Sequence, residues 1–194
     1  MRRLAAGLSF AVAIGVLAIG SSALLHPSAA RAAEDDHKVD CAETNLKFDA
    51  PGYEVTCEDH SERSAGVGEL TIGVKIFVLH AMSEKDITFL DVIDDRIVGS
   101  TRVFYNKTSL ESDIDRYFKG RFTGWADEEE IGGFDVKRFS AVFGNDSEPI
   151  ACLAFRRLGA RRFEGIGGKT VGITCSAQGH EYAVGALKHF TNKD

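Results

Sequence analysis

Cysteine, proline and tryptophan are scarce in this sequence, which has four cysteines, three prolines and a single tryptophan among 194 residues. No two cysteines form a Cys-x-x-Cys pair, and no group of cysteines and histidines has the spacing of a zinc site. The aspartate pattern of a calcium-binding loop is also missing. The sequence therefore predicts no metal site.

The local motifs of several enzyme classes are absent as well. There is no Gly-x-Ser-x-Gly elbow. His180 and Glu181 begin like a zinc-protease helix, but Val184 stands where the second histidine is required. Residues 165–170 end like a nucleotide-binding loop, yet Phe163 occupies the position of its first glycine. These absences favour a non-catalytic protein without a cofactor.

A long apolar run occurs only near the start of the chain. Arg2 and Arg3 precede a mostly apolar stretch over residues 4–25, and Ala30 and Ala32 fit the small-residue exit of a cleavage site. This pattern is typical of a secretory signal peptide. We expect residues 1–32 to be that peptide; the alternative is an uncleaved anchor, since about 20 apolar residues can span a bilayer. Residues 33–194 are then exported, to a bacterial periplasm or outside the cell, with no stable membrane insertion.

Positive charge is also in short supply. The chain has 23 lysines and arginines against 29 acidic residues, and losing a leader with three arginines and no acid lowers the net charge from −6 to −9. Nucleic acids and anionic membranes require a cationic surface. We expect neither as a partner. An unidentified protein or small molecule is expected instead, and a basic one suits this charge.

Four cysteines in an exported chain are expected to form two disulfides. Three pairings are possible. We favour Cys41 with Cys57 and Cys152 with Cys175, because each pair flanks a segment that can fold back on itself. No free thiol would then remain as a nucleophile.

The clearest helix signal lies over residues 108–122. Thr108 and Glu111 have the spacing of a capping box. Apolar side chains recur at helical spacing and need a sheet to cover them. They are Leu110, Ile114, Tyr117, Phe118 and Phe122.

Alternating apolar residues predict strands on both sides of that helix. The strongest covers residues 69–82, with the parity of Val74, Ile76 and Val78 towards the core. A strand over residues 87–93 should turn at Asp94 and Asp95 and return over residues 96–105. Residues 45–48 and 53–57 should form an N-terminal hairpin. Later strands are expected at residues 134–143, 150–156 and 170–176, the last two forming a hairpin, and a helix at residues 179–190.

This order predicts a single globular α+β domain over residues 33–194. A mostly antiparallel sheet would pack against a central amphipathic helix and a short C-terminal helix, with two disulfides.

Trp125 marks the best candidate for a binding surface. It lies between the expected helix and an acidic run. Such a run is commonly just a solvated face. Next to an indole ring, however, carboxylates suit a cationic ligand. The predicted surface consists of Trp125, Asp127, Glu128, Glu129 and Glu130.

A second candidate is the one basic concentration of the chain, between two expected strands. Guanidinium groups bind phosphates and carboxylates, so this segment is interpreted as an anion patch or as a mobile hairpin tip. Its members are Arg156, Arg157, Arg161 and Arg162.

Together these observations predict an exported, non-catalytic binding or accessory domain whose ligand is unknown. The alternative is a small exported hydrolase-like enzyme, with a site assembled from distant histidine, serine and carboxylate residues. His60, His80 and His180 are its candidate bases. The enzyme requires one of them to contact both a carboxylate and a serine in a cleft.

Overall fold

The computed structural model describes residues 37–64, 72–85, 87–98, 105–144, 148–160 and 165–193. All of them belong to one compact unit, Asp35–Asp194. The expected signal peptide, Arg161 and Arg162 lie outside the described residues. Within those ranges, no helix is long and apolar enough to span a lipid bilayer.

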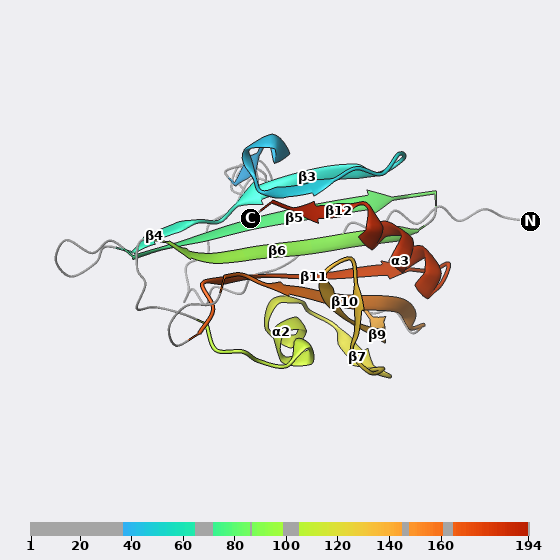
Figure 1. The fold of residues 1–194 in the computed structure, drawn as a ribbon. Coiled ribbons are helices and arrows are strands. Elements are labelled where there is room, and N and C mark those ends of the chain that lie inside the picture. Colours follow the sequence, from blue (N-terminus) through green and yellow to red (C-terminus); the bar gives the residue numbers. More distant parts are fainter. Residues whose placement is uncertain are drawn as a thin grey trace, which may run out of the picture. The chain divides into compact units, whose positions relative to one another are not determined.

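The described segments are mostly strands (Figure 1). In chain order they are β1 (Lys38–Val39), the 3-10 helix η1 (Cys41–Glu43), β2 (Leu46–Phe48), β3 (Glu54–Asp59), β4 (Glu62–Ser64), β5 (Ile72–Ser83), β6 (Thr88–Val98), α2 (Leu110–Tyr117), β7 (Arg121–Thr123), β8 (Glu129–Ile131), β9 (Phe134–Val142), β10 (Ile150–Leu158), β11 (Gly168–Ser176), α3 (His180–Lys188) and β12 (Phe190–Asn192).

One large antiparallel sheet dominates this unit. Its strands follow the order β1-β3-β5-β6-β11-β10-β9-β7, with β4 also paired to β5 and β8 also paired to β9. A small second sheet pairs β2 with β12. The mostly antiparallel sheet is confirmed, as are the β10–β11 hairpin and the C-terminal helix. The architecture leans towards mostly β.

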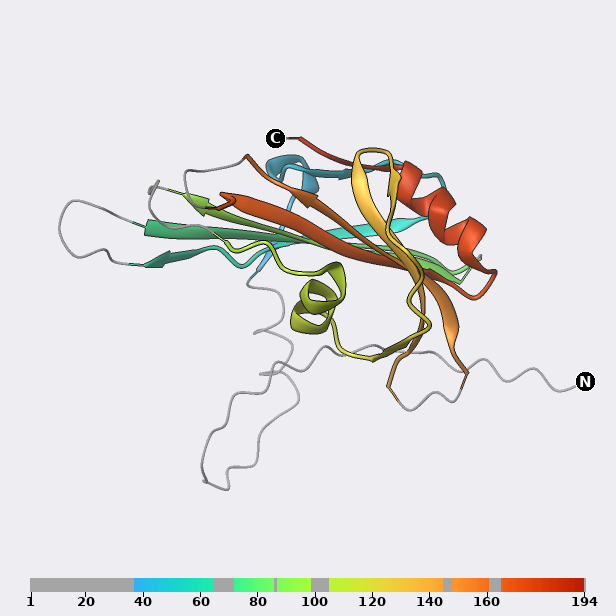
Figure 2. The same cartoon turned by 60° about the horizontal axis from the view of Figure 1, so that its bottom comes forward.

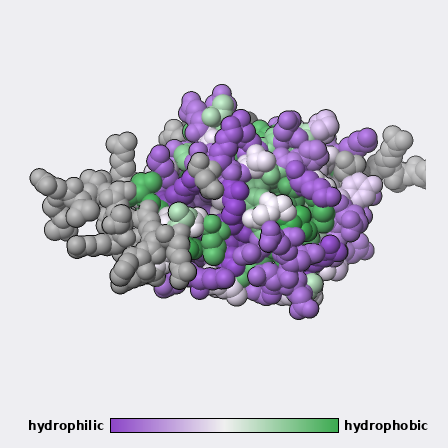
Figure 3. All heavy atoms as spheres, in the orientation of Figure 1, coloured by the Kyte–Doolittle hydropathy of each residue, from purple (hydrophilic) through white to green (hydrophobic). Residues whose placement is uncertain are grey.

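The sheet has a separate hydrophobic core on each face, and Figure 2 shows α3 and α2 on opposite sides of it. On one face, α3 packs against β6, β10 and β11, over a core that includes Leu79, Leu153 and Leu187. On the other, Leu110 and Ile114 of α2 pack into a second core. The surface shown in Figure 3 is mostly hydrophilic, with hydrophobic side chains gathered beside α3.

The expected central amphipathic helix is not confirmed. α2 has eight residues and is capped by the side chain of Ser109, while Thr108 donates instead to the Asp113 carboxylate at 2.7 Å. The backbone becomes extended at Phe118, and Phe122 lies in β7. The apolar stripe therefore belongs to two elements, because the strand pairing of β7 with β9 replaces the later helical turns.

The core-facing side of β5 is the reverse of the prediction. Phe77, Leu79 and Ala81 are buried, with 9%, 0% and 1% of their surface exposed. Ile76 and Val78 lie half-buried on the opposite face. Both sides of this strand are apolar, so the alternation did not identify which side would join the core on the α3 face.

The expected turn at Asp94 and Asp95 is wrong, because β6 runs unbroken through both. Their carboxylates are buried on opposite faces of the sheet. Asp94 accepts hydrogen bonds from Thr170 and Asn192, and Asp95 accepts from two tyrosine hydroxyls. Donors far away in the sequence override the local preference of aspartate for turns.

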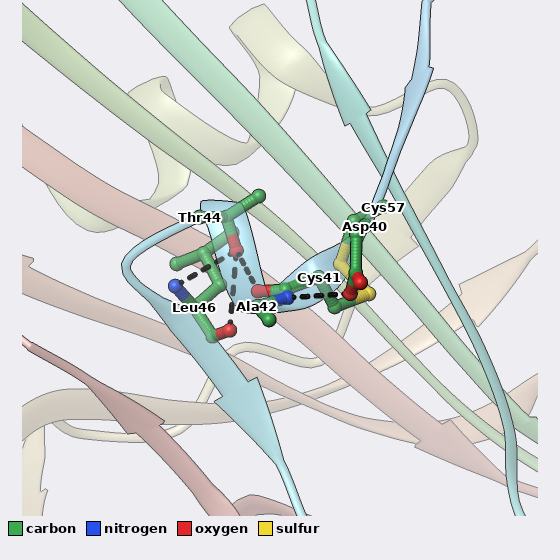
Figure 4. Close-up of a disulfide and its surroundings, with 6 residues drawn as sticks. All are labelled: Asp40, Cys41, Ala42, Thr44, Leu46 and Cys57. Atoms are coloured by element: carbon green, nitrogen blue, oxygen red, sulfur yellow. Dashed lines mark hydrogen bonds between the residues drawn. A yellow bond between two sulfur atoms is a disulfide. The ribbon is translucent and has the colours of Figure 1, made fainter.

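The N-terminal hairpin is also absent, since β2 pairs with β12, and β3 pairs with β1 and β5. The Cys41–Cys57 disulfide joins η1 to β3. In this turn, Asp40 Oδ1 accepts from the Ala42 backbone N–H and Thr44 Oγ1 donates to the Cys41 carbonyl oxygen (Figure 4). The second disulfide joins Cys152 and Cys175, which lie directly opposite each other on β10 and β11. Both bridges have the pairing favoured from the sequence.

Gly172 occupies a position on β11 where no side chain fits. A Cβ atom there would lie 2.2 Å from Phe155 Cζ and 2.8 Å from the carbonyl oxygen of Asp91. We expect Gly172→Ala to lower the free energy of unfolding by about 1–3 kcal/mol, because the neighbouring strand and ring must move. Urea denaturation measures this change.

Gly185→Ala is the matched control, because nothing lies within 4 Å of its Cβ position in α3. It should raise the stability by about 0.5–1 kcal/mol through a lower backbone entropy cost. Equal stabilities for the two variants would contradict the proposed close approach at Gly172.

Candidate binding surface

The large sheet carries α2 on one face, and part of that face is covered by no described helix (Figure 2). α2 packs against β9, β10 and β11, so the neighbouring strands β3, β5 and β6 extend beyond it. Several of their side chains on this face are half-buried. We call this region the open face and define it as Glu58, Ile76, Val78, His80, Asp91 and Ile93.

The strand register brings the open face together. Val78 lies opposite Glu58 on one side and opposite Ile93 on the other. His80 lies opposite Asp91. Because successive side chains point to opposite faces, the intervening Leu79 is directed into the α3 core, where it is fully buried. The same strands thus bury their apolar side chains on one face and leave them partly accessible on the other.

His80 and Asp91 form a polar pair on the open face. His80 Nδ1 lies 2.8 Å from Asp91 Oδ1, and the two side chains are 40% and 30% exposed. The hydrogen bond to Asp91 raises the pKa of His80; burial opposes this, and the negative charges of Asp91 and Glu58 add to it. The pair therefore favours the protonated imidazole more than an isolated histidine does.

A second pair lies at the end of β3, where Glu58 belongs to the strand and His60 follows its last residue. His60 Nε2 lies 2.7 Å from Glu58 Oε2, and the His60 ring contacts the His37 ring with centroids 4.4 Å apart. No group of three or more histidine, cysteine or acidic residues in the described segments could hold a metal ion. These pairs leave carboxylates and imidazoles partly exposed at the surface.

The three candidate bases do not assemble a hydrolase site among the described residues. His60 and His80 pair with carboxylates but bond to no described serine, and His180 Nε2 donates to the Phe139 carbonyl oxygen at 3.1 Å. Ser61 Oγ accepts from the Ile76 backbone N–H. A hollow of about 670 Å³ beside the Cys41–Cys57 disulfide is lined by residues of β1 to β3 and by no histidine.

The structure places the predicted Trp125 surface partly inside the protein. The indole ring stacks on Phe139, with centroids 4.4 Å apart. Asp127, Glu128, Glu129 and Glu130 are all exposed. Glu129 accepts from Arg138 Nε at 2.9 Å. Phe139 therefore occupies one face of the indole, and one of the four acids is paired within the chain.

The two described arginines of the predicted anion patch lie on opposite faces of β10. Arg156 is 1% exposed and bonds to Asp113 and Asp135 on the α2 side. Arg157 stacks on Phe134 and donates to the Asn192 carbonyl oxygen on the α3 side. Adjacent residues of a strand cannot share one surface, so these two do not form a common patch.

The predictions missed a buried ionic cluster beneath α2, formed by Asp113, Arg156 and Lys169. Asp113 accepts from both cations, and all three side chains are 2% exposed. Lys169 Nζ also lies 5.2 Å from the centroid of the Tyr117 ring. The sequence did contain a signal for this cluster. Arg156 on β10 and Lys169 on β11 are charged residues at positions of the same parity as core-facing residues of their strands.

No family model matches the chain, and comparisons with curated proteins and with solved structures return no significant match.

Proposed function

We propose that this protein is an exported, non-catalytic binding domain and that the open face is its binding surface. One observation carries the proposal: Ile76, Val78 and Ile93 stay half-exposed next to two histidine–carboxylate pairs, while the apolar side chains on the reverse side of β5 and β6 are buried in the α3 core. Apolar side chains gathered on a surface and bordered by polar groups mark interaction sites.

The scaffold suits this role because two disulfides cross-link it. The β10–β11 hairpin is bridged by Cys152–Cys175 and the edge of the sheet by Cys41–Cys57. Two disulfides are typical of proteins in an oxidising compartment outside the cytoplasm. A surface that is already ordered loses little conformational entropy when it binds, which supports a preformed sheet as a recognition platform.

Val78→Arg tests the proposal, because it places a bulky charge at the centre of the open face. The wild type is screened by thermal shift against polyamines, basic and acidic peptides, nucleotides, sugars and metal ions. A ligand at 100 times its dissociation constant should stabilise the fold by about 2.7 kcal/mol. NMR perturbations should then map to β3, β5 and β6, and Val78→Arg should abolish both effects.

Lys75→Glu is the matched control on the same strand, since Lys75 is exposed and points to the other side of the sheet. It should leave binding at the open face intact. Ligand perturbations confined to the Trp125 loop or to the hollow near Cys41 would overturn the proposal. So would the absence of binding by every ligand class.

A further inference from the structure

We propose that the open face recognises a basic, amphipathic polypeptide segment, and that His80 with Asp91 forms a pH-sensitive contact of this site. This inference rests on the proposed function and names the partner class of the same surface. It follows from the charge of the open face, from the placement of its apolar side chains and from the geometry of the His80 pair.

Carboxylates dominate the charge of the open face. Glu58 and Asp91 are 26% and 30% exposed, and the exposed Glu54 has the same parity on β3. One lysine, Lys38, lies opposite Glu58 on β1. The chain as a whole has a net charge of −6. Such a field attracts cations and repels phosphates and nucleic acids.

Apolar side chains lie between these carboxylates. Val78 and Ile93 are direct cross-strand neighbours, and Ile76 precedes Val78 by two positions on β5, on the same face. Glu58 borders Val78 on β3, and Asp91 precedes Ile93 by two positions on β6. A segment with both basic and apolar side chains satisfies both features, whereas a simple cation leaves the apolar row exposed. The open face therefore fits a basic polypeptide better than a small cation.

His80 controls how much of the negative charge is available. The charged groups that face it are Asp91 on β6 and Glu58 on β3, while its other cross-strand neighbour, Thr56, is uncharged. With a neutral imidazole, Asp91 presents its full charge to a partner. Protonation of His80 neutralises the pair at a distance of 2.8 Å. Because the pKa of His80 is raised by these carboxylates, a basic partner is released as the pH falls through that pKa.

Three short peptides test the inference: alternating Lys and Val, alternating Glu and Val, and alternating Lys and Ser. Fluorescence anisotropy with the mature chain should show binding of the Lys–Val peptide. The Glu–Val peptide should not bind, and the Lys–Ser peptide should bind at least about ten-fold more weakly, since it lacks the apolar contacts. Glu58→Gln and Asp91→Asn should each weaken Lys–Val binding about five-fold.

The pH contact is tested with the same peptide. Its affinity should fall about five-fold between about pH 8 and about pH 5.5, and His80→Gln should remove most of this dependence. His189→Gln, at an exposed position after α3, should retain it. Unchanged pH dependence in His80→Gln would overturn the role of His80.

The outcomes separate this inference from the proposed function. Equal binding of the Glu–Val and Lys–Val peptides would overturn the inference that the partner is basic. So would a sugar or nucleotide whose NMR perturbations map to β3, β5 and β6 when the Lys–Val peptide does not bind there. Either result would leave the open face as a binding surface. If no ligand class reaches the open face, both fail.

Discussion

Asp113→Asn is expected to lower the free energy of unfolding by about 3–5 kcal/mol, because it leaves two buried cations without their shared counterion. Asp113 Oδ2 accepts from Arg156 at 3.0 Å, and its other oxygen accepts from Lys169 and Thr108. Asparagine keeps the size of the side chain but removes its charge. Asp135 is then the remaining carboxylate bonded to Arg156, and its side chain is 40% exposed.

Urea denaturation of Asp113→Asn, compared with a control variant on the same helix, measures this loss. Asp115→Asn is the control, since Asp115 is exposed on the same helix and should change the stability by less than about 0.5 kcal/mol. Stabilities of Asp113→Asn and Asp115→Asn within about 1 kcal/mol of each other would contradict a structural role for the ionic cluster.

The same carboxylate gives a pH dependence of defined sign. Burial acts to raise the pKa of Asp113, but the hydrogen bonds from Lys169, Thr108 and Arg156 outweigh it, so the pKa lies below the ordinary value of 3.8. A carboxylate with a lowered pKa in the folded state stabilises the protein above its unfolded pKa and loses that contribution as the pH falls through its folded pKa. Acid titration below about pH 4 should therefore destabilise the wild type more steeply than Asp113→Asn.

The second large effect is expected from removal of the buried disulfide. Replacing Cys152 and Cys175 together by alanine should lower the free energy of unfolding by about 3 kcal/mol, because the unfolded chain gains entropy when this bridge, with a sequence separation of 23 residues, is removed. Both cysteines are fully buried in the core beneath α2. Loss of the sulfur atoms from this core adds to the effect.

The Cys41 and Cys57 double alanine variant is the matched comparison. Its separation of 16 residues gives a similar entropic effect of about 3 kcal/mol, but Cys41 is only partly buried. Thermal unfolding should therefore rank the Cys152–Cys175 variant as the less stable of the two. An equal or reversed order would show that core burial adds nothing to this bridge.

Sequence reasoning found the elements that depend on local information. The strands containing Phe139, Leu153 and Ile173 and the helix containing Leu187 lie close to their expected positions, because periodicity and breakers are local signals. The disulfide pairs were also found, since each closes a short loop. The helix around Ile114 was predicted too long, because the competing pairing of β7 with β9 is a long-range contact.

The open face could not be predicted from the sequence for the same reason, because it depends on long-range contacts. His80 was recognised as a candidate, but its pairing with Asp91 depends on the register between β5 and β6. The misplaced turn at Asp94 concealed that register. The parity of Val78 was assigned to the core, because both sides of β5 are apolar and only tertiary packing distinguishes them. The side chains of the candidate site could thus be named but not brought together.

The pairing of β2 with β12 has a consequence for the order in which this chain folds. Strands joined by short connections, such as β5 with β6, can pair early, whereas β2 and β12 join segments from opposite ends of the described chain. Asn192 of β12 supplies an amide donor to the Asp94 carboxylate, 98 positions away. Until β12 docks, that carboxylate lacks the amide and stays hydrated. We therefore expect the α3 side of the sheet to close last, as the slow phase of refolding.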